Sequence, residues 1–259
     1  MQVLTRPWGA MHYRIDGPAT GPVVVFANSL GTDLRLWDQL LAEMPEIRAI
    51  RFDKRGHGLS DEGGNFTVDD LADDAAALIE HLGLGPVIFV GLSIGGMIAQ
   101  LISARRPELI RAAVLSNTAV QMGNAQGWSE RVAAIRAGGI DSIADVIMQR
   151  WFAPAFRARA ELAAWRNMVV RTSAEGYIGA CHALAAADLT ETTRGLTLPV
   201  AVIAGDQDGS SPAELVKATA DLIPDAAFHI IPEAGHLPCV EQPAAFAAIL
   251  RDFLEEHSK

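Results

Sequence analysis

The chain has 259 residues, half of them hydrophobic, and carries a formal net charge of −10. This length suits one large domain, or one domain with an insertion, whose core needs no disulfide or metal to hold it together. The negative charge is spread along the chain, which argues against nucleic acid or an anionic membrane as a partner. An anionic substrate would therefore need a local cluster of arginines to attract it.

The chain contains two cysteines, Cys181 and Cys239, whose spacing matches neither a metal site nor a disulfide framework. We therefore expect a reducing compartment and no metal. The first ten residues lack the basic and apolar regions of a signal peptide. The apolar runs are too short to span a bilayer. The sequence thus predicts a cytoplasmic protein with no membrane partner, and it sets no oligomeric state.

Short apolar runs alternate with helical patterns along most of the chain. The predicted strands span residues 11–16, 23–27, 49–52, 87–91, 112–115, 200–205 and 228–231. The predicted helices span residues 67–82, 93–106, 213–223 and 244–256. Thr67 supplies a hydroxyl cap for the first helix, and Pro107 ends the second. This alternation predicts an α/β fold in which a mostly parallel sheet is flanked by helices.

The stretch 119–189 breaks the alternation. It has no clear strand pattern and is rich in alanine and arginine, while segments 128–137 and 143–151 fit helices. Because the stretch is too long for one ordinary crossover, we expect an inserted helical cap. The core would then comprise residues 1–118 and 190–259. The alternative is that these helices are simply more of the outer layer of the sheet.

The segment Gly91-Leu92-Ser93-Ile94-Gly95 follows an apolar strand pattern and opens a helix. The pentad alone is a weak signal, but between a buried strand and a helix it is typical of a catalytic elbow. Flanking glycines are needed because the turn is tight, and the hydroxyl stands at the positive end of the helix. The sequence therefore predicts Ser93 as the nucleophile of a serine hydrolase with an α/β-hydrolase fold. The alternative is a glycine-rich turn with an idle serine.

A serine hydroxyl needs a base within hydrogen-bonding reach, and the chain has seven histidines. His236 is best placed, because it lies on a glycine-containing loop just past the last predicted strand. It also fits the order serine, acid, histidine along the chain. His57 follows an earlier strand but precedes the serine, and with Asp53 and Arg55 it is better suited to bracing its loop. We therefore predict His236 as the base.

The acid should follow the predicted strand 200–205, where Asp206 and Asp208 are both candidates. Asp206 comes where the strand is still ending. Asp208 lies further out on the loop, from where a side chain can reach His236. We favour Asp208, whose role would be to hold the imidazole tautomer and stabilise the imidazolium.

An oxyanion hole needs two backbone donors. The amide of Ile94, directly after the nucleophile, is one candidate. The other should come from the loop Asn28-Ser29-Leu30-Gly31 after the strand 23–27, and we select the amide of Leu30. The alternative for this loop is an ordinary turn.

Motifs along the whole chain carry a family resemblance. They are Asn28-Ser29-Leu30-Gly31-Thr32-Asp33 with Trp37-Asp38, Asp53-x-Arg55-Gly56-His57-Gly58-x-Ser60, Gly91-Leu92-Ser93-Ile94-Gly95-Gly96-Met97, Ser116-Asn117-Thr118-Ala119, Arg150-Trp151-Phe152, Glu175-Gly176-Tyr177, and Gly235-His236 with Glu241-Gln242-Pro243. On these segments the chain resembles the α/β-hydrolase superfamily and, more narrowly, the 3-oxoadipate enol-lactonases. Asn28-Ser29, where most relatives have His-Gly, and the cap segments are the more specific matches. One departure is Asp206-Gln207-Asp208, where relatives usually have a single aspartate followed by proline.

The resemblance implies a soluble bacterial enzyme of aromatic catabolism that opens an anionic enol-lactone to 3-oxoadipate without a cofactor. The lactone carries a free carboxylate, which an arginine fork binds well. The cap offers six arginines: Arg131, Arg150, Arg157, Arg159, Arg166 and Arg171. We select Arg131 because it lies three residues after Trp128 on one helical face. Trp128 and Trp151 either line the pocket or form the core of the cap.

Two other kinds of function stay open at this point. The same triad would serve a general carboxylesterase, an aminoacrylate-type hydrolase or a cofactor-free haloperoxidase. A receptor that binds a ligand without turnover is the alternative from another class, and the intact set of Ser93, Asp208 and His236 argues against it.

Overall fold

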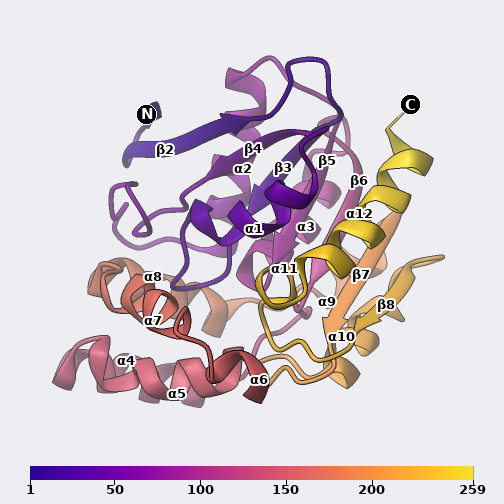
Figure 1. Ribbon diagram of the computed structural model, residues 1–259. Helices are drawn as coiled ribbons and strands as arrows, with labels where there is room; N and C mark the ends of the chain where they lie inside the picture. Colours follow the sequence, from indigo (N-terminus) through magenta and orange to yellow (C-terminus); the bar gives the residue numbers. More distant parts are fainter. Residues whose placement is uncertain (259) are drawn as a thin grey trace.

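Eight strands form one sheet in the computed structural model, which describes residues 1–258 (Figure 1). The strands are β1 (Gln2–Arg6), β2 (Gly9–Asp16), β3 (Val23–Ala27), β4 (Arg48–Phe52), β5 (Val87–Leu92), β6 (Ile110–Ser116), β7 (Val200–Gly205) and β8 (Ala227–Ile231). Their order across the sheet is β1-β2-β4-β3-β5-β6-β7-β8. Neighbours from β4 to β8 are parallel, and β2 pairs antiparallel with both β1 and β4. The mostly parallel sheet predicted from the sequence is confirmed.

The central strands are buried along almost their whole length, which explains why their sequences are continuous apolar runs. Strand β1 has no such run and was missed by the sequence analysis. It lies at the edge of the sheet, where most of its residues are exposed, and Val3 is 50% exposed. An edge strand needs only one partner and buries little surface, so its hydrophobic pattern is weak.

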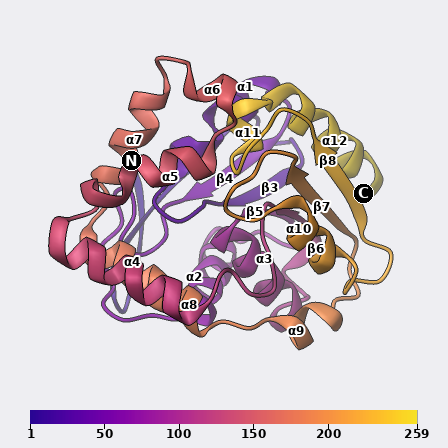
Figure 2. The ribbon, with the colours of Figure 1, turned by 90° about the horizontal axis from the view of Figure 1, so that it is seen from below.

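Helices cover both faces of the sheet (Figure 2). Figure 2 shows α1, α11 and α12 on one side of the strands and α2, α3 and α10 on the other. The bounds of these and the remaining core elements are η1 (Leu34–Trp37), α1 (Asp38–Glu43), α2 (Val68–His81), α3 (Ile94–Arg105), α9 (Thr190–Arg194), α10 (Ala213–Ala220), α11 (Pro238–Glu241) and α12 (Pro243–His257). The expected cap of α2 is present: Thr67 and Asp70 form a reciprocal capping box. None of the helices within residues 1–258 combines the length and apolar character needed to cross a membrane.

The order of the strands creates a crevice in the middle of the sheet. From β3 the chain passes to β4 on one side of β3, and it later enters β5 on the other side. The loops that leave β3 and β5 therefore turn away in opposite directions. In open parallel sheets, ligands bind at the carboxyl ends of the strands at such a switch point. The turn at Ser93 and the loop beginning at Asn28 both lie there.

Between β6 and β7 the chain forms a layer of helices that lies below the sheet in Figure 1. These helices are α4 (Ala125–Gly138), α5 (Asp141–Trp151), α6 (Pro154–Arg157), α7 (Leu162–Val170) and α8 (Ala174–Ala186). Gly176 of α8 meets Gly56 of the core, and a Cβ on Gly56 would lie 2.2 Å from the Cα of Gly176. Two glycines are needed here because the two backbones touch.

Candidate active site

Ser93 lies at the turn between β5 and α3 in a backbone conformation that side-chain-bearing residues rarely adopt, with φ 61° and ψ −120°. Its amide donates to the carbonyl of Ser116 at 2.9 Å, and the hydroxyl of Thr118 donates to its carbonyl at 2.7 Å. Ser93 lies at the N-terminus of α3 and is only 4% exposed. The neighbouring strand β6 and the residues after it therefore hold the strained turn in place.

The two outer glycines of the pentad are required by space. A Cβ on Gly91 would lie 2.0 Å from the carbonyl oxygen of Gly95, and one on Gly95 would lie 2.1 Å from the carbonyl oxygen of Ala27. Both contacts are with backbone, which cannot move aside as a side chain can. The steric reason for the pentad that the sequence suggested is thus visible in the backbone itself.

His236 meets Asp208 as the sequence analysis proposed. Nδ1 of His236 lies 2.8 Å from Oδ2 of Asp208, and both residues are buried. The ring of Trp151 stacks on the imidazole, with the ring centroids 6.3 Å apart. The carboxylate accepts the Nδ1 proton, so Nε2 is left as the proton acceptor. His236 and Ser93 line the same cavity.

Asp208 sits in a cradle of donors that keeps it ionised. Its Oδ1 accepts from the amides of Ser210 and Ser211, and its Oδ2 accepts from Asn117 Nδ2 and from the Ser211 hydroxyl. Burial alone would raise the pKa of this carboxyl, but His236 and the surrounding donors hold the pKa of Asp208 below its ordinary value. From the sequence, Asn117 was noted only as part of a motif, and Ser211 was not identified.

Asp206, the other candidate acid, points elsewhere. It is exposed, and its Oδ1 accepts from the amide of Ala234 at 3.3 Å. Its own amide donates to the carbonyl of Ile231. These bonds place Asp206 at the junction between β7 and β8, whereas Asp208 faces the imidazole.

The loop after β3 is anchored by buried polar groups of the loop after β4. The carbonyl of Ser29 accepts from Lys54 Nζ at 2.6 Å, and the amide of Gly31 donates to His57 Nε2 at 3.0 Å. The C=O and N–H of a trans peptide point in opposite directions. Since the Ser29 carbonyl points to Lys54, the Leu30 amide points away from Lys54. Leu30 lines the cavity that contains Ser93, whereas Ile94 is fully buried as the first residue of α3.

His57 braces this loop, the role that the sequence favoured for it. Its Nδ1 donates to the carbonyl of Arg55 at 2.9 Å, so Nε2 is free to accept from Gly31. Burial and then the nearby charge of Lys54 lower the pKa of His57 well below its ordinary value, which keeps the ring neutral. Burial also lowers the pKa of Lys54 to about 7.

The cavity beside Ser93 has a volume of about 240 Å³. The three residues predicted to contact the substrate, Arg131, Trp128 and Trp151, all line it. Its other lining residues are Ser29, Leu30, Ser93, Met122, Gly123, Asn124, Gly127, Arg150, Tyr177, Leu184, Ser210 and His236. Trp151 is also part of the buried core, so the two interpretations considered for it both apply.

Two of the six arginines considered from the sequence, Arg131 and Arg150, line this cavity. Arg131 lies over the ring of Trp128 at 5.0 Å and donates to the hydroxyl of Tyr177 at 3.4 Å. Arg150 donates to the carbonyl of Gly209. Burial and then the charge of Arg131 lower the pKa of Arg150, because the two cations repel each other. A cation pair in a chain of net charge −10 makes this cavity locally suited to an anion.

The end of α5 is joined to the loops that carry Asp208 and His236. The amide of Gly209 donates to the carbonyl of Arg150 at 3.0 Å, and the amide of His236 donates to the carbonyl of Trp151 at 2.6 Å. These bonds fix the two loops relative to one end of the helical layer, at the point where Arg150 and Trp151 face the cavity.

Glu241 completes this junction from α11. Its two carboxylate oxygens accept from the amides of Gly235 and Ala153, each at 2.8 Å. The side chain is buried, and burial raises the pKa of Glu241 to about 7. Sequence reasoning noted Glu241 only as part of a motif, because its partners are far away along the chain.

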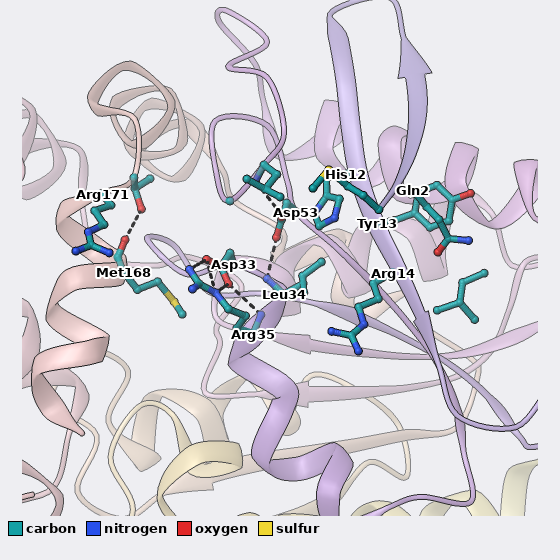
Figure 3. Close-up of a pocket in the computed structure, with 15 residues that line it drawn as sticks. Gln2, His12, Tyr13, Arg14, Asp33, Leu34, Arg35, Asp53, Met168 and Arg171 are labelled. Carbon is teal, nitrogen blue, oxygen red and sulfur yellow. Dashed lines mark hydrogen bonds and ion pairs between the residues drawn. The ribbon is translucent and has the colours of Figure 1, made fainter. Parts of the chain in front are cut away.

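A larger hollow of about 720 Å³ lies elsewhere, between β2, the loop after β3 and α7 (Figure 3). Figure 3 shows Met168 and Arg171 on one side of it and Arg14 on the other. Its central polar groups already bind each other: Asp33 pairs with Arg35, and Asp53 accepts from His12 and from the Leu34 amide. Neither Ser93 nor His236 lines it.

Comparison with known proteins supports the fold and the class of enzyme. Residues 19–249 match the alpha/beta hydrolase family. The 3-oxoadipate enol-lactonase 2 of Acinetobacter baylyi is 35% identical over 92% of this chain and 90% of its own length. The chain therefore belongs to the alpha/beta hydrolase family, which confirms the resemblance described above.

Solved structures give the same picture. The enol-lactonase from Burkholderia xenovorans LB400 has a TM-score of 0.94 at 33% identity, covering 98% of this chain and 100% of that one. A thermophilic esterase from Thermogutta terrifontis, described as malate-bound, has a TM-score of 0.91 at 28% identity, covering 99% of each chain. Enol-lactonases and esterases are hydrolases that act on ester bonds.

The buried carboxyl of Glu241 predicts a specific dependence of stability on pH. The unfolded side chain ionises near its ordinary pKa of 4.5, whereas the folded one keeps its proton up to about 7. The folded state binds more protons in this window, so the contribution of Glu241 to the free energy of unfolding falls as pH rises from about 4.5 to about 7. Glutamine cannot titrate. The difference in unfolding free energy between the wild type and Glu241→Gln, measured by urea denaturation, should therefore fall across this window.

The exposed Glu255 of α12 provides the control. Glu255→Gln removes an exposed carboxylate in the same way and is measured beside Glu241→Gln over the same range of pH. Parallel pH curves for the wild type and Glu241→Gln would contradict the prediction.

Proposed function

We propose that this chain is a serine hydrolase that opens 3-oxoadipate enol-lactone to 3-oxoadipate through an acyl-enzyme. The observation that carries the proposal is the buried His236–Asp208 pair, which shares a cavity with Ser93 and with two arginines. The enol-lactonase relatives, which cover nearly the whole chain, support the choice of substrate. The reaction needs no cofactor.

In this mechanism Ser93 attacks the ring carbonyl while Nε2 of His236 takes its proton. Asp208 stabilises the imidazolium that forms. The amides of Leu30 and Ile94 donate to the oxyanion. The ring C–O bond then breaks, and the enol oxygen leaves with the proton held by His236. The enol stays tethered to the acyl group, because the ester was part of a ring.

Water completes the cycle. His236 removes a proton from the water, which attacks the acyl-enzyme, and the proton then returns to Ser93. The product is an open diacid whose enol tautomerises to a ketone. An enol is a better leaving group than a simple alkoxide, and its tautomerisation draws the reaction forward.

The free carboxylate of the lactone would bind at Arg131 and Arg150. Guanidinium groups bind carboxylates in bidentate fashion, and a partly buried site strengthens the attraction. The phenol of Tyr177 lies beside Arg131, and burial raises its pKa to about 12, so it remains a neutral donor. Trp128 and Trp151 would cover the apolar side of the ring. Arg150 was among the six arginines considered from the sequence but was not the one selected.

We further propose that residues 119–189 act as a cap that supplies substrate contacts, with residues 1–118 and 190–259 as the catalytic core. The position of Arg131, Arg150 and Tyr177 in the helical layer supports this division. A cytoplasmic location is supported by Cys181 and Cys239, which are both free thiols.

A carboxylesterase, an aminoacrylate-type hydrolase or a cofactor-free haloperoxidase would use the same triad. The paired cations distinguish the lactonase from an esterase of neutral substrates, because a neutral ester gives them no charge to bind. A turnover assay with the enol-lactone beside a neutral aryl ester is the direct test. A strong preference for the lactone is expected, whereas a strong preference for the aryl ester would favour a general esterase.

Replacing Ser93 should abolish turnover. Ser93→Ala removes the nucleophile, and loss of the corresponding group in a serine protease lowers kcat by about 10⁶-fold. The thermal unfolding temperature should change little, because only one oxygen atom is lost. Near-normal turnover by this variant would exclude the serine mechanism.

The two aspartates offer a matched pair for testing the acid. Asp208→Asn should lower kcat by about 10⁴-fold, because an amide cannot hold the same imidazole tautomer. Asp206→Asn should leave kcat within about twofold, because the side chain is exposed and away from His236. A larger loss for Asp206→Asn would reverse the assignment.

The cations should govern affinity for the charged substrate. Arg131→Ala and Arg150→Ala should each raise KM for the lactone by about 10- to 100-fold, the value of a charged hydrogen bond. KM for a neutral aryl ester should stay nearly constant. Arg166→Ala is the control, because Arg166 pairs with Asp141 and Asp145 at the surface. An unchanged KM in either cavity variant would remove that arginine from the site.

A further inference from the structure

Three serine hydroxyls within the described part of the chain are buried without a hydrogen-bond partner, those of Ser29, Ser103 and Ser258. Ser258 is a partly exposed residue just after α12, whereas Ser29 and Ser103 are buried as whole residues. Ser29 is 1% exposed and Ser103 is 2% exposed. A buried hydroxyl without a partner costs roughly 1–3 kcal/mol of stability. Such a group therefore needs an explanation wherever it occurs. The two serines differ in their surroundings, because Ser29 lines the cavity beside Ser93, whereas Ser103 does not.

The backbone of Ser29 is held by several hydrogen bonds, while its hydroxyl makes none within the described part of the chain. Its carbonyl accepts from Lys54 Nζ at 2.6 Å, from the Thr32 hydroxyl at 2.9 Å and from the Thr32 amide at 3.3 Å. Three donors on one carbonyl fix the orientation of the residue. The hydroxyl is thus a pre-positioned polar group whose partner is missing.

The next residue along the chain suggests what that partner is. The same peptide that directs the Ser29 carbonyl to Lys54 directs the Leu30 amide the other way. Leu30 and Ser29 both line the cavity with Ser93. The Ser29 hydroxyl belongs to a residue that lines the cavity of Ser93 and that precedes a proposed oxyanion donor, so it is near enough to donate to the same negative charge. The unpaired Ser29 hydroxyl costs stability in the resting enzyme, and it would gain a partner only when the negative charge forms on the substrate oxygen. An interaction made only at that stage lowers the activation free energy of the reaction.

We propose that the Ser29 hydroxyl is a third donor to the oxyanion, beside the amides of Leu30 and Ile94. Its O–H donates to the former carbonyl oxygen in both tetrahedral intermediates, and no bond to Ser29 forms or breaks. The assignment rests on the proposed nucleophile Ser93, but not on the identity of the ester. Ser29 contacts the reacting atoms and is therefore a catalytic residue in this scheme.

The test compares Ser29→Ala with Ser103→Ala, a matched control that removes an equally buried and equally unpartnered hydroxyl. Each variant is assayed with 3-oxoadipate enol-lactone and with p-nitrophenyl acetate, and its thermal unfolding is followed. Ser29→Ala should lower kcat by about 100-fold on both esters, the lower end of the cost of one oxyanion donor, with KM nearly constant. Both variants should melt at or above the temperature of the wild type, because each loses an unsatisfied group. Ser103→Ala should keep its kcat.

A kcat for Ser29→Ala within about twofold of the wild type on the aryl ester would overturn the proposal. A loss confined to the lactone, or an effect on KM alone, would also overturn it, because an oxyanion donor serves every ester and acts on kcat. Ser29→Cys gives a second variant in case the alanine protein does not fold. The thiol nearly keeps the shape of the side chain but is a weak donor, so its kcat should also fall on both esters.

The proposed substrate and the proposed role of Ser29 can be contradicted independently. A wild-type enzyme that hydrolyses p-nitrophenyl acetate but not the lactone would contradict the proposed substrate, and the comparison at Ser29 would still be decided on the aryl ester. If Ser93→Ala retained ester turnover, Ser93 would not be the nucleophile. The proposed role of Ser29, which depends on attack by Ser93, would then be contradicted too.

Discussion

The turn at Ser93 leaves no room for a side chain at Gly91 or Gly95. Strand β5, helix α3 and the end of β3 approach so closely there that a single methyl group would overlap backbone atoms. This closeness forces Ser93 into its strained conformation and lifts its side chain out of the sheet. It also brings the loop after β3 next to Ser93. The position of this loop thus follows from the same steric constraint as the position of the serine.

Around this turn, buried polar side chains bind mainly to backbone groups. Lys54 binds a carbonyl of the loop after β3, His57 accepts an amide of the same loop, and Glu241 accepts the amides of Gly235 and Ala153. These groups have little solvent to relax around them, so the loops that they hold are rigid. Preorganised donors need no rearrangement when charge develops, which is the property that an oxyanion hole requires.

Most of the fold could be predicted from the sequence because its signals are local. Buried parallel strands are continuous apolar runs, and the elbow of Ser93 needs its glycines within five residues. Strand β1 and helix α1 were missed because an edge strand and a short helix bury too little to leave a pattern. The burial and contacts of Asp206 and Asp208 separate two aspartates that differ in the sequence only by their distance from the strand.

The missing parts of the candidate site are contacts between distant segments. Asn117 reaches Asp208 across 91 residues, and Glu241 reaches Ala153 across 88. No local spacing encodes such pairs. Arg150 and Tyr177 were visible as residue types, but their common cavity with Arg131 depends on how α4, α5 and α8 pack together. Composition could suggest that an arginine cluster was needed, but it could not say which arginines form it.

The backbone hydrogen bonds at the end of α5 also bear on how a ligand can enter and leave the cavity. Lifting the helical layer at this end would break the hydrogen bonds donated by the amides of Gly209 and His236 and would displace His236. Within residues 1–258, no such backbone hydrogen bond joins the start of α4 to the loops of Asp208 and His236. Gly123 and Asn124, just before α4, and Gly127, within it, are exposed and line the cavity. We therefore expect a ligand to enter and leave the cavity at the start of α4, while the end of α5 stays in place.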